Sequence, residues 1–154
     1  MNEQESASID LFLKDTSFSG KETTIKRFIK KVLLFLGLAS WDLSVIFLDA
    51  DSMRMLNLQY RGENESTDVL SFSQLSQPKL PAMQKQVLGD IAIDGNRVHN
   101  QAQLLDIDED EELYRCLVHG ILHLAGMTHP EGWASEMIMI QEWIISRRMS
   151  LLYL

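Results

Sequence analysis

The segment L-Y-R-C-L-V-H-G-I-L-H-L-A-G-M-T-H, from Leu113 to His129, carries both the clearest core pattern and the clearest chemical pattern of this chain. Its apolar residues recur at helical spacing and form one stripe, which consists of Leu113, Leu117, Ile121 and Leu124. A different face of the same helix carries Cys116, His119, Gly120 and His123. The segment therefore predicts a helix that packs into the core on one side and presents histidines on another.

Three of the chain's four histidines lie in this segment. His119 and His123 are four residues apart, so one helical turn places both imidazoles on the same face. Gly126 permits the positive φ that ends a helix and lets the chain return His129 as a third nitrogen ligand. Three protein nitrogens leave one of zinc's usual four positions open, which favours a catalytic site. We expect one zinc ion per chain at His119, His123 and His129; the alternative is one core histidine, two surface histidines and no metal.

Size and composition favour one intracellular domain. With 154 residues, of which 45% are hydrophobic, the chain can bury a single core, and we expect residues 1–154 to form one metal-dependent hydrolase-like domain. The only cysteine, Cys116, cannot form an internal disulfide, which favours a reducing compartment. The N-terminus lacks the pattern of a signal peptide, and the longest apolar run, Val32–Ala39, is too short to cross a bilayer. A cytoplasmic protein without a membrane partner is expected.

The charge of the chain limits how it can bind a polyanion. The formal net charge is −8, which opposes non-specific binding to nucleic acid, so a polyanionic substrate would need a local basic cleft. An acidic run, from Asp106 to Glu112, precedes the histidine helix. It is either a cation site or the first turn of a helix, where carboxylates favour the positive end of the helix dipole; we favour the second interpretation.

The order of periodic segments predicts the fold class. Apolar alternation indicates strands, and helical spacing indicates helices. The expected elements are a strand at 9–13, a helix from a capping box at 19–22 to Gly37, a strand from 43 to about 49, a helix at 51–60 with Asp51 near its cap, a polar loop at 61–66, strands at 67–73 and 87–94, helices at 96–105 and in the histidine segment, and a last helix from about Ala134. We predict an α+β domain with a mixed sheet of about four strands packed with helices, and a metal site on a helix and the turn after it.

The histidine spacing invites comparison with zinc peptidases, whose motif is H-E-x-x-H-x-x-G-x-x-H. Here Gly120 takes the place of the glutamate that serves as general base in those enzymes. Glycine also clears space, either for a bulky group or for close approach of another backbone. Hydrolysis of peptides is therefore disfavoured. Cleavage of RNA fits better, because the 2′-hydroxyl of RNA is an internal nucleophile.

Three segments carry a resemblance to a known family. The segment from His119 to Gly126, followed by His129, is similar to the motif H-G-x-L-H-L-x-G-Y-D-H of YbeY-type endoribonucleases, the bacterial family of ribosomal RNA maturation factors. Leu56–Gly62 and Thr67–Phe72 resemble that family's block L-N-x-x-Y-R-x-x-x-x-x-T-D-V-L-S-F, and Leu88–Ile91 resembles its L-G-D-I strand. The similarity runs from about Asp42 to Glu142 in the same order and spacing.

The resemblance implies a zinc-dependent endoribonuclease that acts on single-stranded RNA, in particular ribosomal RNA or a ribosomal subunit, during rRNA maturation and ribosome quality control. It implies zinc held by the three histidines, and Arg61 as a catalytic residue that meets substrate phosphate across the cleft; no DNA substrate is expected. Met127-Thr128 departs from the family's Tyr-Asp, which removes a carboxylate beside the last histidine. The alternative function is a ribosome-maturation binding factor with a structural metal and little nuclease activity, and a metallopeptidase comes third.

Four further side chains have two interpretations each. Asp68 and Asp90 either accept hydrogen bonds from the imidazoles or cap the backbone at strand ends. Cys116 is either a ligand or, as we favour, a small buried thiol. His99 lies outside the cluster, and we expect an ordinary helix residue rather than a ligand.

Overall fold

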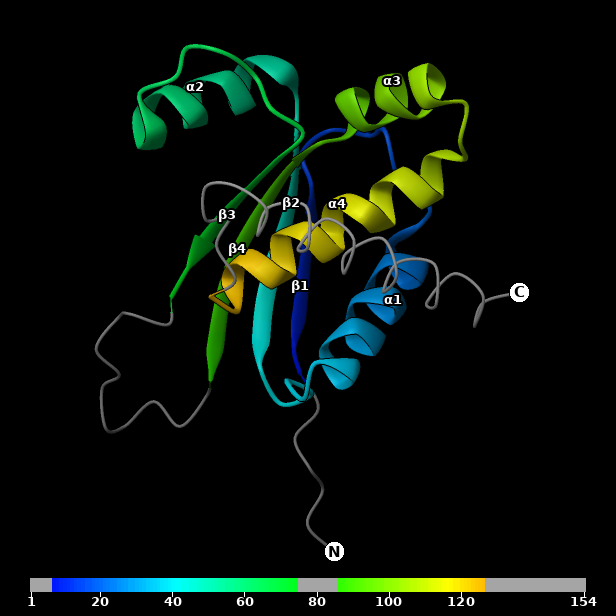
Figure 1. The fold of residues 1–154 in the computed structure, drawn as a ribbon, viewed down its shortest axis with the longest axis vertical. Helices are drawn as coiled ribbons and strands as arrows, with labels where there is room; N and C mark the ends of the chain where they lie inside the picture. Colours follow the sequence, from blue (N-terminus) through cyan, green and yellow to red (C-terminus); the bar gives the residue numbers. More distant parts are fainter. Residues whose placement is uncertain (1–6, 75–85, 127–154) are drawn as a thin grey trace, which may run out of the picture.

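The computed structural model describes residues 7–74 and 86–126, which form four strands and four helices (Figure 1). Along the chain the elements are β1 (Ile9–Leu13), α1 (Glu22–Phe35), β2 (Asp42–Leu48), α2 (Ala50–Arg61), β3 (Val69–Ser73), β4 (Val87–Asp94), α3 (Gly95–Leu105) and α4 (Glu109–Leu124). The predicted α+β class and the mixed four-stranded sheet are confirmed. The helix predicted from Ala134 lies outside the described residues.

The sheet has the strand order β1-β2-β4-β3. Strands β1, β2 and β4 run parallel, and β3 pairs antiparallel with β4 at one edge. Alternate residues of each strand face opposite sides, so Val45, Ile91 and Ser71 share one face while Ile46, Ala92 and Leu70 share the other. This alternation determines which side chains can reach each layer of helices.

Helices α1 and α4 cover the first face of the sheet, and Figure 1 shows α4 crossing the strands with α1 beside it. The predicted stripe of α4 is buried, with Leu113, Leu117, Ile121 and Leu124 no more than 1% exposed. Removing such side chains from water is the main stabilising contribution to the fold. On the other face, Met53 of α2 packs with Leu70 and Ala92 in a smaller core cluster.

Two helix starts differ from the sequence prediction. The predicted capping box at 19–22 is wrong, because Lys21 is the N-cap of α1 and no side chain caps that end. The cap of α2 is Asp49 rather than Asp51: its carboxylate accepts a hydrogen bond of 2.7 Å from the Ser52 N–H, which lowers the pKa of Asp49. Sequence periodicity identified both helices, and the capping geometry moved their ends by one or two residues.

The second half of the acidic run, Glu109–Glu112, forms the first turn of α4, and neighbouring side chains contact it. Lys21 Nζ lies 2.6 Å from Asp110 Oδ1 and 3.3 Å from Glu109 Oε1, and the hydrogen bond with Asp110 raises the pKa of Lys21. His99 also contacts Glu109, and its ring stacks on Phe18 with the centroids 4.6 Å apart. These contacts agree with the helix-dipole interpretation of the run and with a structural role for His99.

Gly120 sets how closely α4 approaches the sheet. A Cβ at this position would lie 3.1 Å from Ile91 Cδ1 and 3.3 Å from Ser71 Oγ, and the Gly120 carbonyl accepts a 3.1 Å hydrogen bond from Ser71 Oγ. Of the two reasons considered for glycine here, the structure supports close approach of the helix to the sheet. A glutamate at this position would have to enter the interface between α4 and strands β3 and β4.

No helix among residues 7–74 and 86–126 is long and apolar enough to span a bilayer.

We expect Gly120→Glu to lower the free energy of unfolding by about 3 kcal/mol or more, because it forces a carboxylate into a close-packed apolar interface. Chemical denaturation monitored by circular dichroism measures the change. Gln103→Glu is the matched control, since it adds the same charge at an exposed position of α3. Equal denaturation midpoints for the two variants would contradict the close packing of α4.

Candidate active site

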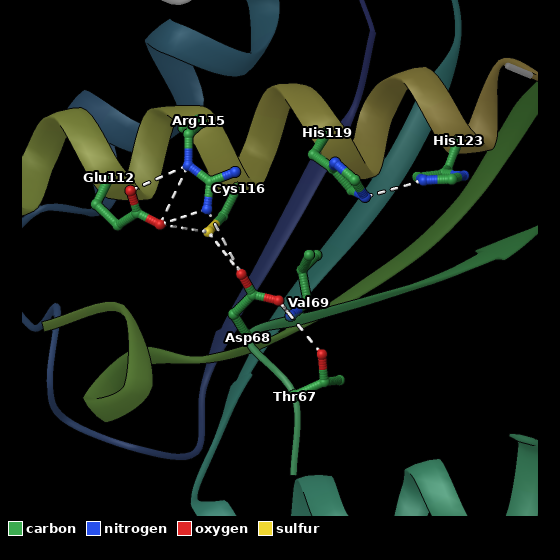
Figure 2. Close-up of polar contacts among 8 residues, drawn as sticks. All are labelled: Thr67, Asp68, Val69, Glu112, Arg115, Cys116, His119 and His123. Carbon is green, nitrogen blue, oxygen red and sulfur yellow. Dashed lines mark hydrogen bonds and ion pairs between the residues drawn. The ribbon is translucent and has the colours of Figure 1, made fainter. Parts of the chain in front are cut away.

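Helix α4 brings two imidazoles together at its C-terminal half. His119 and His123 are half-buried, their rings are 4.5 Å apart, and the Nε2 atoms lie 2.9 Å from one another (Figure 2). The one-turn spacing predicted from sequence therefore makes both nitrogens converge on one point. Two imidazoles bound to the same zinc ion, each about 2 Å from it, hold their nitrogens roughly 3 Å apart. The arrangement of this pair fits a shared metal ion.

The third predicted ligand, His129, lies outside the described residues, as do Met127 and Thr128. The chain before it behaves as predicted: α4 ends at Leu124, and Gly126 has a φ of 92°. Only glycine adopts this conformation without strain, so the turn after the helix depends on it.

Strand β3 fixes α4 at the histidines. The side chains of Ser71 and Ser73 donate hydrogen bonds of 3.1 and 3.2 Å to the carbonyls of Gly120 and Leu124. These carbonyls lie in the turns of the helix that carry the two imidazoles. The edge strand therefore holds the C-terminal end of the helix against the sheet and sets where His119 and His123 point.

The two histidines open onto a cleft of about 270 Å³. Its other lining residues come from the end of α2 and from the β3 region: Arg61, Thr67, Asp68, Val69, Ser71 and Ser73. Arg61 was predicted to lie in a polar loop, and this is wrong by one residue, because it is the last residue of α2. Gly62 ends the helix with a φ of 71°, and Arg61 remains exposed. The fold thus places a guanidinium and two imidazoles, from distant parts of the sequence, around one cavity.

A second group of possible ligands lies nearer the start of α4. The ligand atoms of Asp68, Glu112 and Cys116 are all within 4.8 Å of one another, close enough to hold a metal ion. However, Figure 2 shows the Arg115 guanidinium among them, with Nη2 2.5 Å from Glu112 Oε1 and Nε 3.0 Å from Oε2. The buried Glu112 carboxylate is thus already neutralised by a cation, and its hydrogen bonds raise the pKa of Arg115.

The Cys116 thiol belongs to this second group and does not line the cleft. Its sulfur is 3.7 Å from both Asp68 Oδ2 and Glu112 Oε1. Burial, together with the Asp68 charge, raises the pKa of Cys116 and keeps the thiol protonated. A protonated thiol is a poor metal ligand, so the interpretation of Cys116 as a small buried thiol agrees with the structure.

The two aspartates of the matched segments have different surroundings. Asp68 Oδ1 accepts a 2.9 Å hydrogen bond from the Val69 N–H, which is the capping role at the start of β3. Asp90 lies on the opposite face of the sheet from Ser71, where it accepts hydrogen bonds from Ser44 Oγ and, at 3.2 Å, from Gln74 Nε2. Neither set of contacts involves an imidazole.

Sequence reasoning did not identify Ser71 and Ser73 as part of the site. Their signal was present: residues 69, 71 and 73 alternate along a strand, so they share a face, and two of the three are polar. Hydroxyls on one face of a strand can donate to a helix packed there, and the α4 carbonyls accept from them.

Comparison with known proteins identifies a family that this chain resembles over most of its length. Residues 10–148 match the model of the family described as Endoribonuclease YbeY. A protein of that name from Treponema denticola is 39% identical over 123 residues, which cover 79% of each chain. Another from Persephonella marina is 32% identical over 124 residues, which cover 78% of this chain and 80% of the relative.

A solved structure has the same fold. The solution structure of TM1509 from Thermotoga maritima aligns with a TM-score of 0.65 at 25% sequence identity, and the alignment covers 94% of this chain and 91% of that one. Together with the family match over most of the sequence, these findings show that the chain belongs to the endoribonuclease YbeY family.

Proposed function

We propose that this protein is a zinc-dependent endoribonuclease that cuts single-stranded RNA and acts in the maturation and quality control of ribosomal RNA. The observation that carries the proposal is the convergence of Arg61, His119 and His123 on one cleft, in a chain that belongs to a family of this activity. The substrate is ribosomal RNA, free or in a ribosomal subunit, and the protein works in the cytoplasm.

The proposed metal is one zinc ion held by His119, His123 and His129. The 2.9 Å separation between the first two Nε2 atoms supports it, and the turn at Gly126 precedes the third ligand in the sequence. When bound, zinc would supply a positive charge that stabilises negative charge on a phosphoryl oxygen.

Arg61 has the chemistry to orient the substrate phosphate. Its guanidinium stays charged and offers a planar fork of donors that matches two phosphate oxygens. It lines the same cleft as the histidines. Because the chain has a net charge of −8, local cations of this kind must overcome a repulsive overall field.

RNA provides its own nucleophile in this scheme. The 2′-hydroxyl loses its proton to solvent and attacks the adjacent phosphorus, and the bond to the 5′-oxygen of the next nucleotide breaks. That oxygen takes up a proton from solvent and leaves as a 5′-hydroxyl, so a 2′,3′-cyclic phosphate remains on the other fragment. DNA lacks this hydroxyl and is not expected to be cut. An unpaired strand suits the cleft, because its backbone can adopt the in-line geometry that a duplex prevents.

The runner-up function is a ribosome-maturation binding factor whose metal is structural and whose nuclease activity is weak. The acidic net charge and the Thr128 position, where the family pattern has a carboxylate, favour it. A metallopeptidase is disfavoured, because Gly120 replaces the peptidase glutamate that serves as general base, and a side chain at this position would be in tight contact with Ile91 and Ser71.

We expect the purified protein to bind one equivalent of zinc, and His123→Ala to lose it, because two remaining ligands hold zinc poorly. Elemental analysis after reconstitution and desalting measures the content. His99→Asn serves as the control, since it removes a histidine that does not line the cleft. Wild-type protein that retains no stoichiometric zinc would contradict the proposed site.

We expect Arg61→Ala to reduce RNA cleavage or binding about 10- to 100-fold, the loss of one charge-assisted hydrogen-bonded contact. The melting temperature and zinc content should stay near wild type, because the side chain is exposed. The slope of log Kd against log salt should fall by about one. Arg97→Ala, at an exposed arginine of α3, is the matched control. If Arg61→Ala instead lowers the melting temperature and leaves RNA binding and cleavage unchanged, the role of Arg61 is to stabilise the fold.

We expect the protein to cleave single-stranded RNA, to leave peptides intact and to produce 2′,3′-cyclic phosphate or 3′-phosphate ends. Mass spectrometry of the fragments identifies the ends. An oligonucleotide with one deoxyribose at the cleaved position should resist cleavage. Fragments with 3′-hydroxyl ends would show that water, rather than the 2′-hydroxyl, attacks. Cleavage that persists after chelation and in His123→Ala would come from a contaminant and would favour the runner-up function.

A further inference from the structure

A second cavity, of about 580 Å³, lies on the opposite side of strand β3 from the histidine cleft. Leu48 and Leu56 give it apolar walls, and Tyr60 and Phe72 give it aromatic walls. Gln74 and Asp90 contribute polar groups. This size and this combination of apolar walls with a few polar groups are typical of sites that hold small organic groups. We call it the Tyr60 groove.

The Tyr60 groove adjoins the cleft across strand β3. Ser73 lines both cavities, and the neighbouring residues Tyr60 and Arg61 contribute one to each. Along β3, Ser71 faces the helix α4 while Leu70 and Phe72 face the other side. Only the edge strand therefore separates the two cavities, and a chain bound in the cleft can place its next group in the groove.

An aromatic pair forms one wall of the groove. The rings of Tyr60 and Phe72 are 5.0 Å apart and inclined by 65°, an edge-to-face contact that holds the Tyr60 ring in place. Tyr60 is nevertheless 61% exposed, so much of its ring remains uncovered. An exposed, oriented aromatic ring beside a phosphate site is the feature with which proteins stack the bases of single-stranded nucleic acids.

The charge of the groove selects a base rather than a phosphate. Asp90 is its charged lining residue among those that the structure describes, and a carboxylate repels phosphate. The Asp90 side chain accepts from Ser44 and Gln74, and its remaining lone pairs can accept from a base amino group. Arg61 lies in the adjoining cleft, where the phosphate belongs.

We propose that the Tyr60 groove binds one unpaired nucleobase next to the phosphate that Arg61 contacts. The inference rests on the proposed function and adds to it a stacking site for the substrate. A single strand would cross the edge of the sheet at Ser73, with its sugar-phosphate backbone in the cleft and one base on the Tyr60 ring.

The test measures binding of a single-stranded RNA that carries 2′-O-methyl groups and cannot be cut. We expect Tyr60→Ala to weaken binding about 5- to 100-fold, the usual range for one stacked base, and Tyr60→Trp to retain it. Met55→Ala is the matched control, because Met55 lies on the same helix, is 63% exposed and lines neither cavity. Thermal melting of each variant checks that the fold is intact.

A second arm identifies the base. An abasic site is moved along the oligonucleotide one position at a time, and one position should weaken binding to wild-type protein as much as Tyr60→Ala does. At that position the abasic site should not weaken binding to Tyr60→Ala any further, because the abasic site and the variant remove the same contact between ring and base. A 2-aminopurine at this position should lose fluorescence on binding to wild type and keep it with Tyr60→Ala.

The outcomes separate the two proposals. If wild-type protein neither binds nor cuts single-stranded RNA, the proposed function and the groove inference both fail. If wild type binds RNA but Tyr60→Ala matches Met55→Ala, or if the abasic and Tyr60 losses simply add, the groove inference is overturned and the proposed function stands.

Discussion

The close contact between α4 and strand β3 is the constraint on which the rest of the structure depends. Gly120 allows the helix backbone to reach Ile91 and Ser71, and two serine hydroxyls then bind carbonyls at the end of the helix. The same contact buries the apolar stripe of α4 and fixes the two imidazoles. Stability and site geometry therefore rely on one interface, and a glutamate in place of Gly120 would crowd this interface and bring a charge to it.

The edge position of β3 places one cavity on each side of this strand. Because alternate residues of a strand face opposite sides, the serines of β3 reach the histidine helix while Leu70 and Phe72 reach α2. The end of α2 contributes Arg61 to one cavity and Tyr60 to the other. One short strand and one helix end thus provide a cleft that contains a guanidinium and, on the other side of the strand, an aromatic groove.

Several carboxylates of this acidic chain are paired with specific cations. Lys21 binds two carboxylates of the first turn of α4, and Arg115 neutralises the buried Glu112. The second pair lies close to the cleft, since Asp68 both lines the cleft and contacts this network. A buried carboxylate that has its own guanidinium does not need a metal ion, which distinguishes this group from the histidine pair.

The sequence by itself determined the elements and the pairing of two histidines on one helix face. Periodicity identified all eight described helices and strands, because burial of one face leaves a regular apolar pattern, and His119 and His123 were placed together by the helical repeat. Helix ends at Lys21 and Asp49 were missed, because they depend on hydrogen-bond geometry. Only the tertiary structure decided that Arg61 opens onto the histidines and Tyr60 onto a separate groove, and that Ser71 and Ser73 hold the end of α4. The two serine contacts join residues 49 and 51 positions apart, and packing of the sheet against its helices, which local pattern does not encode, sets them.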